Sequence, residues 1–247
     1  MEQLEFLDVI TSQASFLAAA ARTVGPDAAT PATPEWTMAK LVKHTGTTHR
    51  WVLAIAATRQ FANPGDLDLG LPDDEAAYPE WIEAGAAQLT ATLREIDPDD
   101  DMWSWGPDQH ARFWSRRMAH ETTIHRWDAQ SATAAQDAIE VALAIDGIDE
   151  RLVNLAASLN FGPVSADALT GAGESVHLHA TDGDGEWVLR FEPDGLAVTR
   201  EHAKGDVAVR GAANDLLLYL VGRRGLEGFE IFGDETVLTS RDAIRGF

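Results

Sequence analysis

The chain has 247 residues, no cysteine, and a formal net charge of −21 from 40 acidic and 19 basic residues. This charge disfavours nucleic acid and anionic membranes as partners, and the missing cysteine excludes disulfides, thiolate metal ligands and a thiol nucleophile. Any metal site must therefore use histidine and carboxylate ligands. The acidic N-terminus and the short apolar runs predict a cytoplasmic protein with neither a secretory signal nor a membrane span.

The first half of the sequence predicts helices separated by loops. Helical periodicity covers residues 2–22, 35–61, 76–96 and 110–135, with turn-rich or acidic segments between them. Four helices of this length predict a four-helix bundle over residues 1–136. Such bundles often build metal sites between facing helices.

The second half changes character. One more helix is predicted at 139–159, and strand-like alternation follows at 176–182, 186–192 and 196–202. An apolar strand and helix then occupy 207–225. Residues 137–247 therefore predict a small α+β domain with an antiparallel sheet, which makes the whole chain α+β.

The segment HETTIHRW, residues 120–127, places Glu121 and His125 four residues apart on a predicted helix. The two side chains differ by only ~40° around the helix and project together. An inward Glu–His pair is costly to bury unless it is paired or metal-bound, so the spacing indicates a metal site or a buried ion pair. His120 is expected to face the surface or a loop. His110 lies ~16 Å along the helix from Glu121, too far to share an ion.

The remaining histidines leave alternatives open. His44 and His49 share a predicted helix but point ~140° apart, so they cannot both bind one ion, and periodicity does not choose between them. His177 and His179 face one way on a predicted strand. That spacing can chelate a metal, but a solvated strand face is the favoured interpretation. His202 lies in a charged turn and carries no signal.

Three segments occur in order along the chain: PEWTMAKLVKH at 34–44, HETTIHRWDA at 120–129 and GAANDLLLYLVGR at 211–223. Together they resemble the mycothiol-dependent maleylpyruvate isomerase family of actinobacterial proteins, and the resemblance spans essentially the whole chain. It implies a DinB-like four-helix metal-binding domain at 1–136 and a sterol-carrier-like α+β domain at 137–247.

The resemblance also implies a divalent metal, usually zinc, with an open water position. Its ligands map to His44, Glu121 and His125, which selects His44 over His49. Three N/O ligands and an exchangeable water are typical of a catalytic zinc site. Asp128, one turn beyond His125, is placed to orient a ligand or to pair with an arginine.

The family further implies mycothiol or a similar low-molecular-weight thiol as cosubstrate. The implied reaction is cis–trans isomerisation of a carboxylate-bearing, maleylpyruvate-like small molecule, or S-transfer of the thiol. The catalytically important arginine maps to Arg223, beside Arg224, and would clamp a substrate carboxylate across the domain interface. The alternatives are a hydrolase that uses a metal-bound water and a non-catalytic module that binds a small ligand.

Overall fold

The computed structural model describes residues 2–155, 157 and 166–246. The chain forms two compact units, Met1–Ala138 and Ile139–Phe247. The first is helical and the second contains a five-stranded sheet, so the predicted α+β fold class is confirmed. Each unit is described below by itself.

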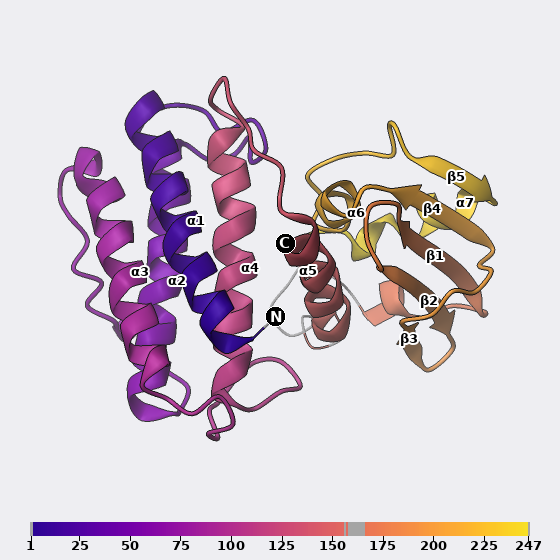
Figure 1. Ribbon diagram of the computed structural model, residues 1–247, viewed down its shortest axis with the longest axis horizontal. Helices are drawn as coiled ribbons and strands as arrows, with labels where there is room; N and C mark the ends of the chain where they lie inside the picture. The colour runs from indigo at the N-terminus through magenta and orange to yellow at the C-terminus, as the bar shows by residue number, and fades with distance from the viewer. Residues whose placement is uncertain (1, 156, 158–165, 247) are drawn as a thin grey trace. The chain divides into compact units, whose positions relative to one another are not determined.

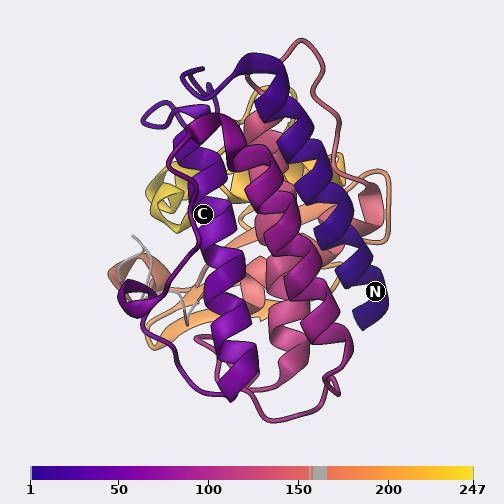
Figure 2. The same cartoon turned by 90° about the vertical axis from the view of Figure 1, so that its left-hand side faces the viewer.

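Four long helices form the first unit (Figures 1 and 2). Their bounds are α1 Gln3–Val24, α2 Met38–Thr58, α3 Tyr78–Arg94 and α4 Ala111–Gln130. Local signals make the last three shorter than the periodicity predicts. The hydroxyl of Thr37 accepts a hydrogen bond from the Lys40 amide and fixes the start of α2. Arg59 adopts a left-handed backbone and ends that helix.

Helix α1 packs one face against α3 and α4. Among the described residues it is the one helix that is long and apolar enough to cross a membrane by length and composition. Its Leu7, Ile10 and Leu17 are fully buried. The apolar face of α1 therefore contributes to the core of the helical unit, and its composition has a structural explanation.

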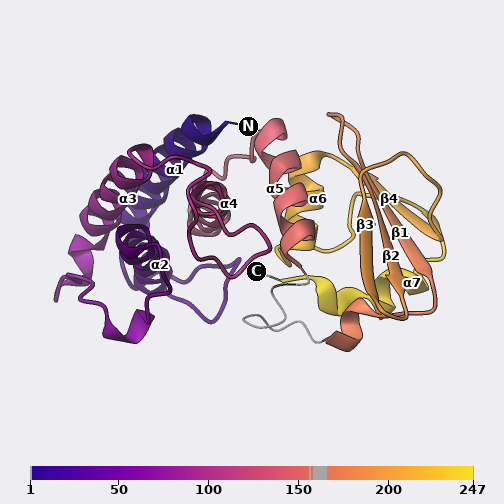
Figure 3. The same ribbon diagram turned by 90° about the horizontal axis from the view of Figure 1, so that it is seen from below.

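Helix α4 combines a polar sequence with extensive burial, and Figure 3 shows it in a view along the four helices. Polar and charged residues account for much of its buried surface: Ser115, Arg117, His120, Thr122, Thr123, His125, Arg126, Asp128 and Gln130. Buried polar groups are tolerated only when they are hydrogen-bonded. The side chains of α4 must therefore find partners on one another and on their neighbours.

The second unit places its helices beside a mixed sheet (Figure 3). The sheet has the order β3-β2-β1-β4-β5. The bounds are α5 Val141–Asn154, β1 Glu174–Ala180, β2 Glu186–Glu192, β3 Gly195–Thr199, β4 Val207–Gly211, α6 Ala213–Leu220, β5 Glu230–Gly233 and α7 Thr236–Ser240. Helix α5 ends before position 159, and residues 156, 158 and 159 of the predicted helix lie outside the described residues.

The prediction of a wholly antiparallel sheet is wrong, because β1 pairs with β4 in parallel. Strands β1, β2 and β3 form an antiparallel meander, and residues 200–206 then carry the chain back across β2 and β1. Strand β4 then pairs with the other edge of β1, in the same direction as β1. On the helix-facing side, the indole of Trp187 donates to Asp149 of α5 at 2.6 Å.

The packing of α2 on α3 depends on a glycine. A Cβ at Gly46 would lie 2.1 Å from Trp81 Cζ3. That ring is held in place, because its Nε1 donates to the Leu69 carbonyl and the Arg50 guanidinium stacks on it at 3.8 Å. We expect Gly46→Val to lower the free energy of unfolding of the helical unit by about 1–3 kcal/mol through overpacking, measured by urea denaturation.

The matched control is Gly65→Val, because a Cβ at Gly65 would have only ordinary contacts with the Asn63 side chain, from 3.6 Å outward. This change should leave the free energy of unfolding within about 0.5 kcal/mol of the wild type. Equal stability of the two variants would contradict the close packing at Gly46.

Candidate metal centre

Helices α2 and α4 bring three potential ligands together. His44 comes from α2, and Glu121 and His125 come from α4. The Glu121 Oε1 atom lies 3.2 Å from His44 Nε2 and 3.3 Å from His125 Nε2. One ligand atom from each residue lies within 4.8 Å of the other two, a separation that could hold one metal ion. The group therefore contains two imidazole nitrogens and one carboxylate oxygen.

Two further residues of α4 orient these side chains. His125 Nδ1 is 2.9 Å from the carboxylate of the fully buried Asp128. When His125 is neutral, Nδ1 donates to this acceptor and Nε2 carries the lone pair. When His125 is protonated, Nε2 also donates to Glu121. Arg117 Nη2 donates to Glu121 Oε2 at 3.0 Å, so the other oxygen, Oε1, faces the two imidazoles.

An aromatic side chain borders the group. The ring centroid of Trp36, in the loop before α2, is 4.8 Å from that of His44 and 5.9 Å from that of His125. The His125 side chain is 3% exposed, whereas that of His44 is 41% exposed. The group is therefore reachable from solvent on the His44 side.

The charges of the group are strongly coupled. Burial raises the pKa of Glu121, but hydrogen bonds from His125 and His44 and the charge of Arg117 outweigh burial and hold that pKa well below its ordinary value. Burial lowers the pKa of His125, yet its bonds to Asp128 and Glu121 outweigh burial and raise it. Glu121 is therefore an anion at neutral pH.

The second histidine of α2 lies apart from this group. His49 is completely buried, and its Nε2 is 2.8 Å from Thr122 Oγ1. The Thr122 hydroxyl donates to the Met118 carbonyl at 2.6 Å, so its oxygen accepts from His49 Nε2. Periodicity left His44 and His49 as alternatives, and the structure brings His44 together with Glu121.

The expectation that His120 faces the surface or a loop is wrong. His120 is 3% exposed, and its ring meets Phe6 of α1 edge-on at a centroid distance of 6.0 Å. Helix α1 packs against that side of α4, which single-helix periodicity cannot reveal. His110 is at the start of α4 and contacts Asp108 at 2.5 Å, away from Glu121 as its position along the helix requires.

Sequence reasoning missed Trp36 and Arg117 as neighbours of the group. Arg117 precedes Glu121 by four residues, so an i, i+4 charge pair was a usable signal. Trp36 lies outside the regular helix, and no periodicity could place it. In this loop the Trp36 amide donates to the Thr33 carbonyl, and the Trp36 carbonyl accepts from both the amide and the hydroxyl of Thr30.

Arg223 and Arg224 follow α6 in the second unit. Gly222 has a left-handed backbone (φ 75°) that ends the helical segment, and Arg223 Nη1 donates to the Val221 carbonyl at 3.0 Å. Arg224 pairs with Asp215 at 2.5 Å and also stacks on an aromatic ring. Contacts within the second unit therefore account for the position of Arg224.

The interpretation of His177 and His179 as a solvated strand face is wrong in part. The His177 side chain is only 8% exposed, and both residues lie beside Glu186. His202, which carried no signal in the sequence, joins the same group. Register between strands and the path of a connection, rather than local spacing, place these residues together.

The buried His49 gives the stability of the protein a predictable dependence on pH. Burial lowers the pKa of His49 to about 4, against an ordinary value of 6.5 in the unfolded chain. Above pH 6.5 both states are neutral. As the pH falls from 6.5 towards 4 only the unfolded state takes up the proton, and stability falls by up to about 1.4 kcal/mol per pH unit.

We expect His49→Gln to flatten this pH dependence, because glutamine does not titrate. The measurement is the free energy of unfolding from urea denaturation at several pH values between 4 and 6.5. A slope equal to that of the wild type would contradict a neutral, buried His49.

Comparison with known proteins assigns the family. Two family models match, the mycothiol maleylpyruvate isomerase N-terminal domain over residues 7–130 and the MDMPI C-terminal domain over residues 142–240. No curated protein sequence matches the chain. A crystal structure of the mycothiol-dependent maleylpyruvate isomerase has 16% sequence identity and a TM-score of 0.58, covering 94% of this chain and 93% of that chain.

A crystal structure of a histidine-to-alanine mutant of the mycothiol-dependent maleylpyruvate isomerase is similar to the same degree. It has 16% identity and a TM-score of 0.56, with coverage of 94% and 93%. At this identity the two structures show a shared fold, while the two family models together cover most of the sequence. The chain belongs to the mycothiol-dependent maleylpyruvate isomerase family.

Proposed function

We propose that this protein is a metal-dependent enzyme with a low-molecular-weight thiol, mycothiol or a similar compound, as cosubstrate, acting in the cytoplasm. The metal ligands are His44, Glu121 and His125. The observation that carries the proposal is the meeting of these three side chains at Glu121 Oε1, within 3.3 Å of both imidazoles. Family membership supports the thiol.

The donor set fits a divalent ion such as Zn²⁺. Two imidazole nitrogens and one carboxylate oxygen are typical of zinc sites that retain an exchangeable position. Asp128 supports this assignment, because a carboxylate on the far nitrogen of a ligand histidine fixes its tautomer and makes it a stronger ligand. Binding of the ion competes with protonation of His125, because Asp128 and Glu121 raise the pKa of this histidine.

A bound divalent ion would supply the Lewis acidity that keeps a thiol in its thiolate form at neutral pH. Because the chain has no cysteine, the thiol must come from outside. The more exposed side of the group, at His44, is where such a molecule would approach. The ring of Trp36 lies beside the two imidazole rings.

The reaction is a maleylpyruvate isomerase-like cis–trans isomerisation or an S-transfer of the thiol. In the isomerisation the thiolate adds to the activated double bond, the resulting single bond rotates, and elimination releases the same thiol with the trans alkene. In the S-transfer the neighbouring carbon of the adduct takes up a proton instead of expelling the thiolate, so the carbon–sulfur bond is kept. Arg223 binds a substrate carboxylate, for which the planar guanidinium offers two parallel donors.

The metal assignment predicts the outcome of elemental analysis. We expect His44→Ala and His125→Ala each to lower the bound divalent metal by one ion per chain, because each removes one of three ligands. His110→Ala is the matched control: His110 is partly exposed, lies at the start of the same helix as His125, and belongs to neither group of potential ligands. Unchanged metal content in both ligand variants, after reconstitution with zinc, would refute the assignment.

The thiol and Arg223 predict a kinetic result. We expect turnover of maleylpyruvate only in the presence of mycothiol or a substitute thiol. Arg223→Ala should lower kcat/KM by roughly 10- to 100-fold, the worth of a charge-assisted hydrogen-bonded pair. Arg224→Ala is the control, since contacts within its own unit hold Arg224. Hydrolysis of esters in the absence of thiol, together with no turnover of maleylpyruvate when a thiol is added, would instead indicate a hydrolase.

A further inference from the structure

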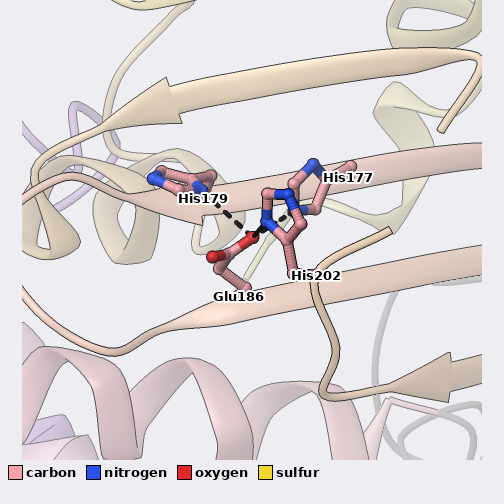
Figure 4. A group of neighbouring side chains, drawn as sticks. All are labelled: His177, His179, Glu186 and His202. Carbon is pink, nitrogen blue, oxygen red and sulfur yellow. Dashed lines mark hydrogen bonds and ion pairs between the residues drawn. The ribbon is translucent and has the colours of Figure 1, made fainter. Parts of the chain in front are cut away.

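A second group of potential ligands lies on the sheet of the second unit, in a place that the proposed function does not use. His177, His179 and His202 surround the carboxylate of Glu186 (Figure 4). Glu186 Oε2 is 2.9 Å from His177 Nε2, 3.1 Å from His179 Nδ1 and 2.5 Å from His202 Nδ1. One ligand atom from each of the four residues lies within 4.8 Å of the others.

Strand register builds most of this group. His177 and His179 are two residues apart on β1 and so face the same side of the sheet. Glu186 of β2 is paired directly with His179. The neighbouring pair, Leu178 and Trp187, points to the opposite side, where Trp187 bonds to α5. The group therefore occupies the face of the sheet turned away from α5.

The crossing connection supplies the fourth residue. Residues 200–206 must span from β3 to β4, three strand spacings or ~14 Å, and His202 lies within this connection. The connection lies close to β1: a Cβ at Gly205 would be 2.9 Å from the His177 amide nitrogen. Asp206 fastens its end, accepting from both the amide and the hydroxyl of Ser175 at 2.8 Å.

Hydrogen bonds to Glu186 alone do not account for the three imidazoles around one carboxylate oxygen. A carboxylate oxygen has lone pairs for about two donors, whereas three ring nitrogens gather around Glu186 Oε2. A cation within the group would use all four side chains, with the imidazoles as lone-pair donors and the carboxylate as the anionic ligand. Three nitrogens and one oxygen suit Zn²⁺ and neighbouring first-row transition metals, and not Mg²⁺ or Ca²⁺, which prefer oxygen.

We propose that His177, His179, Glu186 and His202 form a second metal site that binds Zn²⁺ or a similar first-row transition-metal ion. Four protein ligands occupy all four positions of a tetrahedral zinc ion, and this is typical of a structural site rather than a catalytic one. The ion fastens the connection at 200–206 to strands β1 and β2. His202, 80% exposed, provides the side from which the ion enters.

Zinc binding to the full-length chain tests the proposal, by equilibrium dialysis at micromolar zinc followed by elemental analysis. We expect two ions in the wild type, one in His44→Ala, one in His179→Ala and none when both changes are combined. A His179→Ala chain that binds as much zinc as the wild type would overturn the second site, as would a His44→Ala chain that binds none.

The two proposals fail in distinguishable ways. If His44→Ala binds as many ions as the wild type while His179→Ala binds one fewer, the second site stands and the first is refuted. Activity is not needed for this readout. His110→Ala again serves as the control, because His110 also contacts aspartate yet lies outside both groups. Loss of an ion in that variant would overturn the assignment to these residues.

Substituting His202, the most exposed of the four proposed ligands, tests the site with little effect on folding. In a His44→Ala background, His202→Ala should retain the fold and weaken zinc binding by about 100-fold or more, since even residues that only orient ligands are worth 10–100-fold. Zinc should raise the Tm of the His44→Ala chain and leave that of the His44→Ala/His202→Ala chain unchanged. Equal zinc-dependent shifts in the two chains would overturn the structural role.

Discussion

The bond between Asp128 and His125 is the constraint on which the candidate metal centre depends. Asp128 is fully buried, so its charge must be compensated by a close partner, and His125 is that partner one turn earlier on the same helix. The bond fixes which imidazole nitrogen carries the proton and which faces Glu121. This one interaction thus both compensates a buried charge of α4 and orients one of the potential ligands.

Arg117 completes this arrangement from the other end. Its guanidinium occupies one oxygen of Glu121, so only the second oxygen is available to His44 and His125. With His125 protonated, the charges of Arg117, Glu121, His125 and Asp128 alternate along the helix. Such alternation lets a helix bury four ionisable groups, each beside a group of opposite charge. It also leaves Oε1 of Glu121 and Nε2 of His125 facing His44 of α2.

The two carboxylate–imidazole groups at Glu121 and Glu186 reflect the unusual charge balance of the chain. With 40 acidic and only 19 basic side chains, lysine and arginine cannot pair with every carboxylate. Histidines add to Arg117 at Glu121 and surround the carboxylate of Glu186. A helix pair builds the first group and a sheet with its crossing connection builds the second. The same donor chemistry thus arises from two kinds of backbone geometry.

The local elements were readable because each depends on neighbours in sequence. Spacing on one helix put Glu121 and His125 on one face, and two-residue alternation put His177 and His179 on one side of a strand. The α+β class followed from the change of periodicity near the middle of the chain. The exact helix ends could not be predicted in this way, because a hydroxyl cap at Thr37 or a left-handed Arg59 overrides hydrophobic periodicity.

The sequence by itself determined the Glu121–His125 and His177–His179 pairs, with their four-residue and two-residue spacings, and the absence of a cysteine that could supply a thiol. Only the tertiary structure decided which residue from a distant element joins each group. Both histidines of α2 reach α4, and the way the two helices pack places His44 beside Glu121 and His49 beside the next residue, Thr122. His202 reaches Glu186 because the chain must cross the sheet to add β4. Both choices depend on how elements pack, and a pattern within one element carries no information about that.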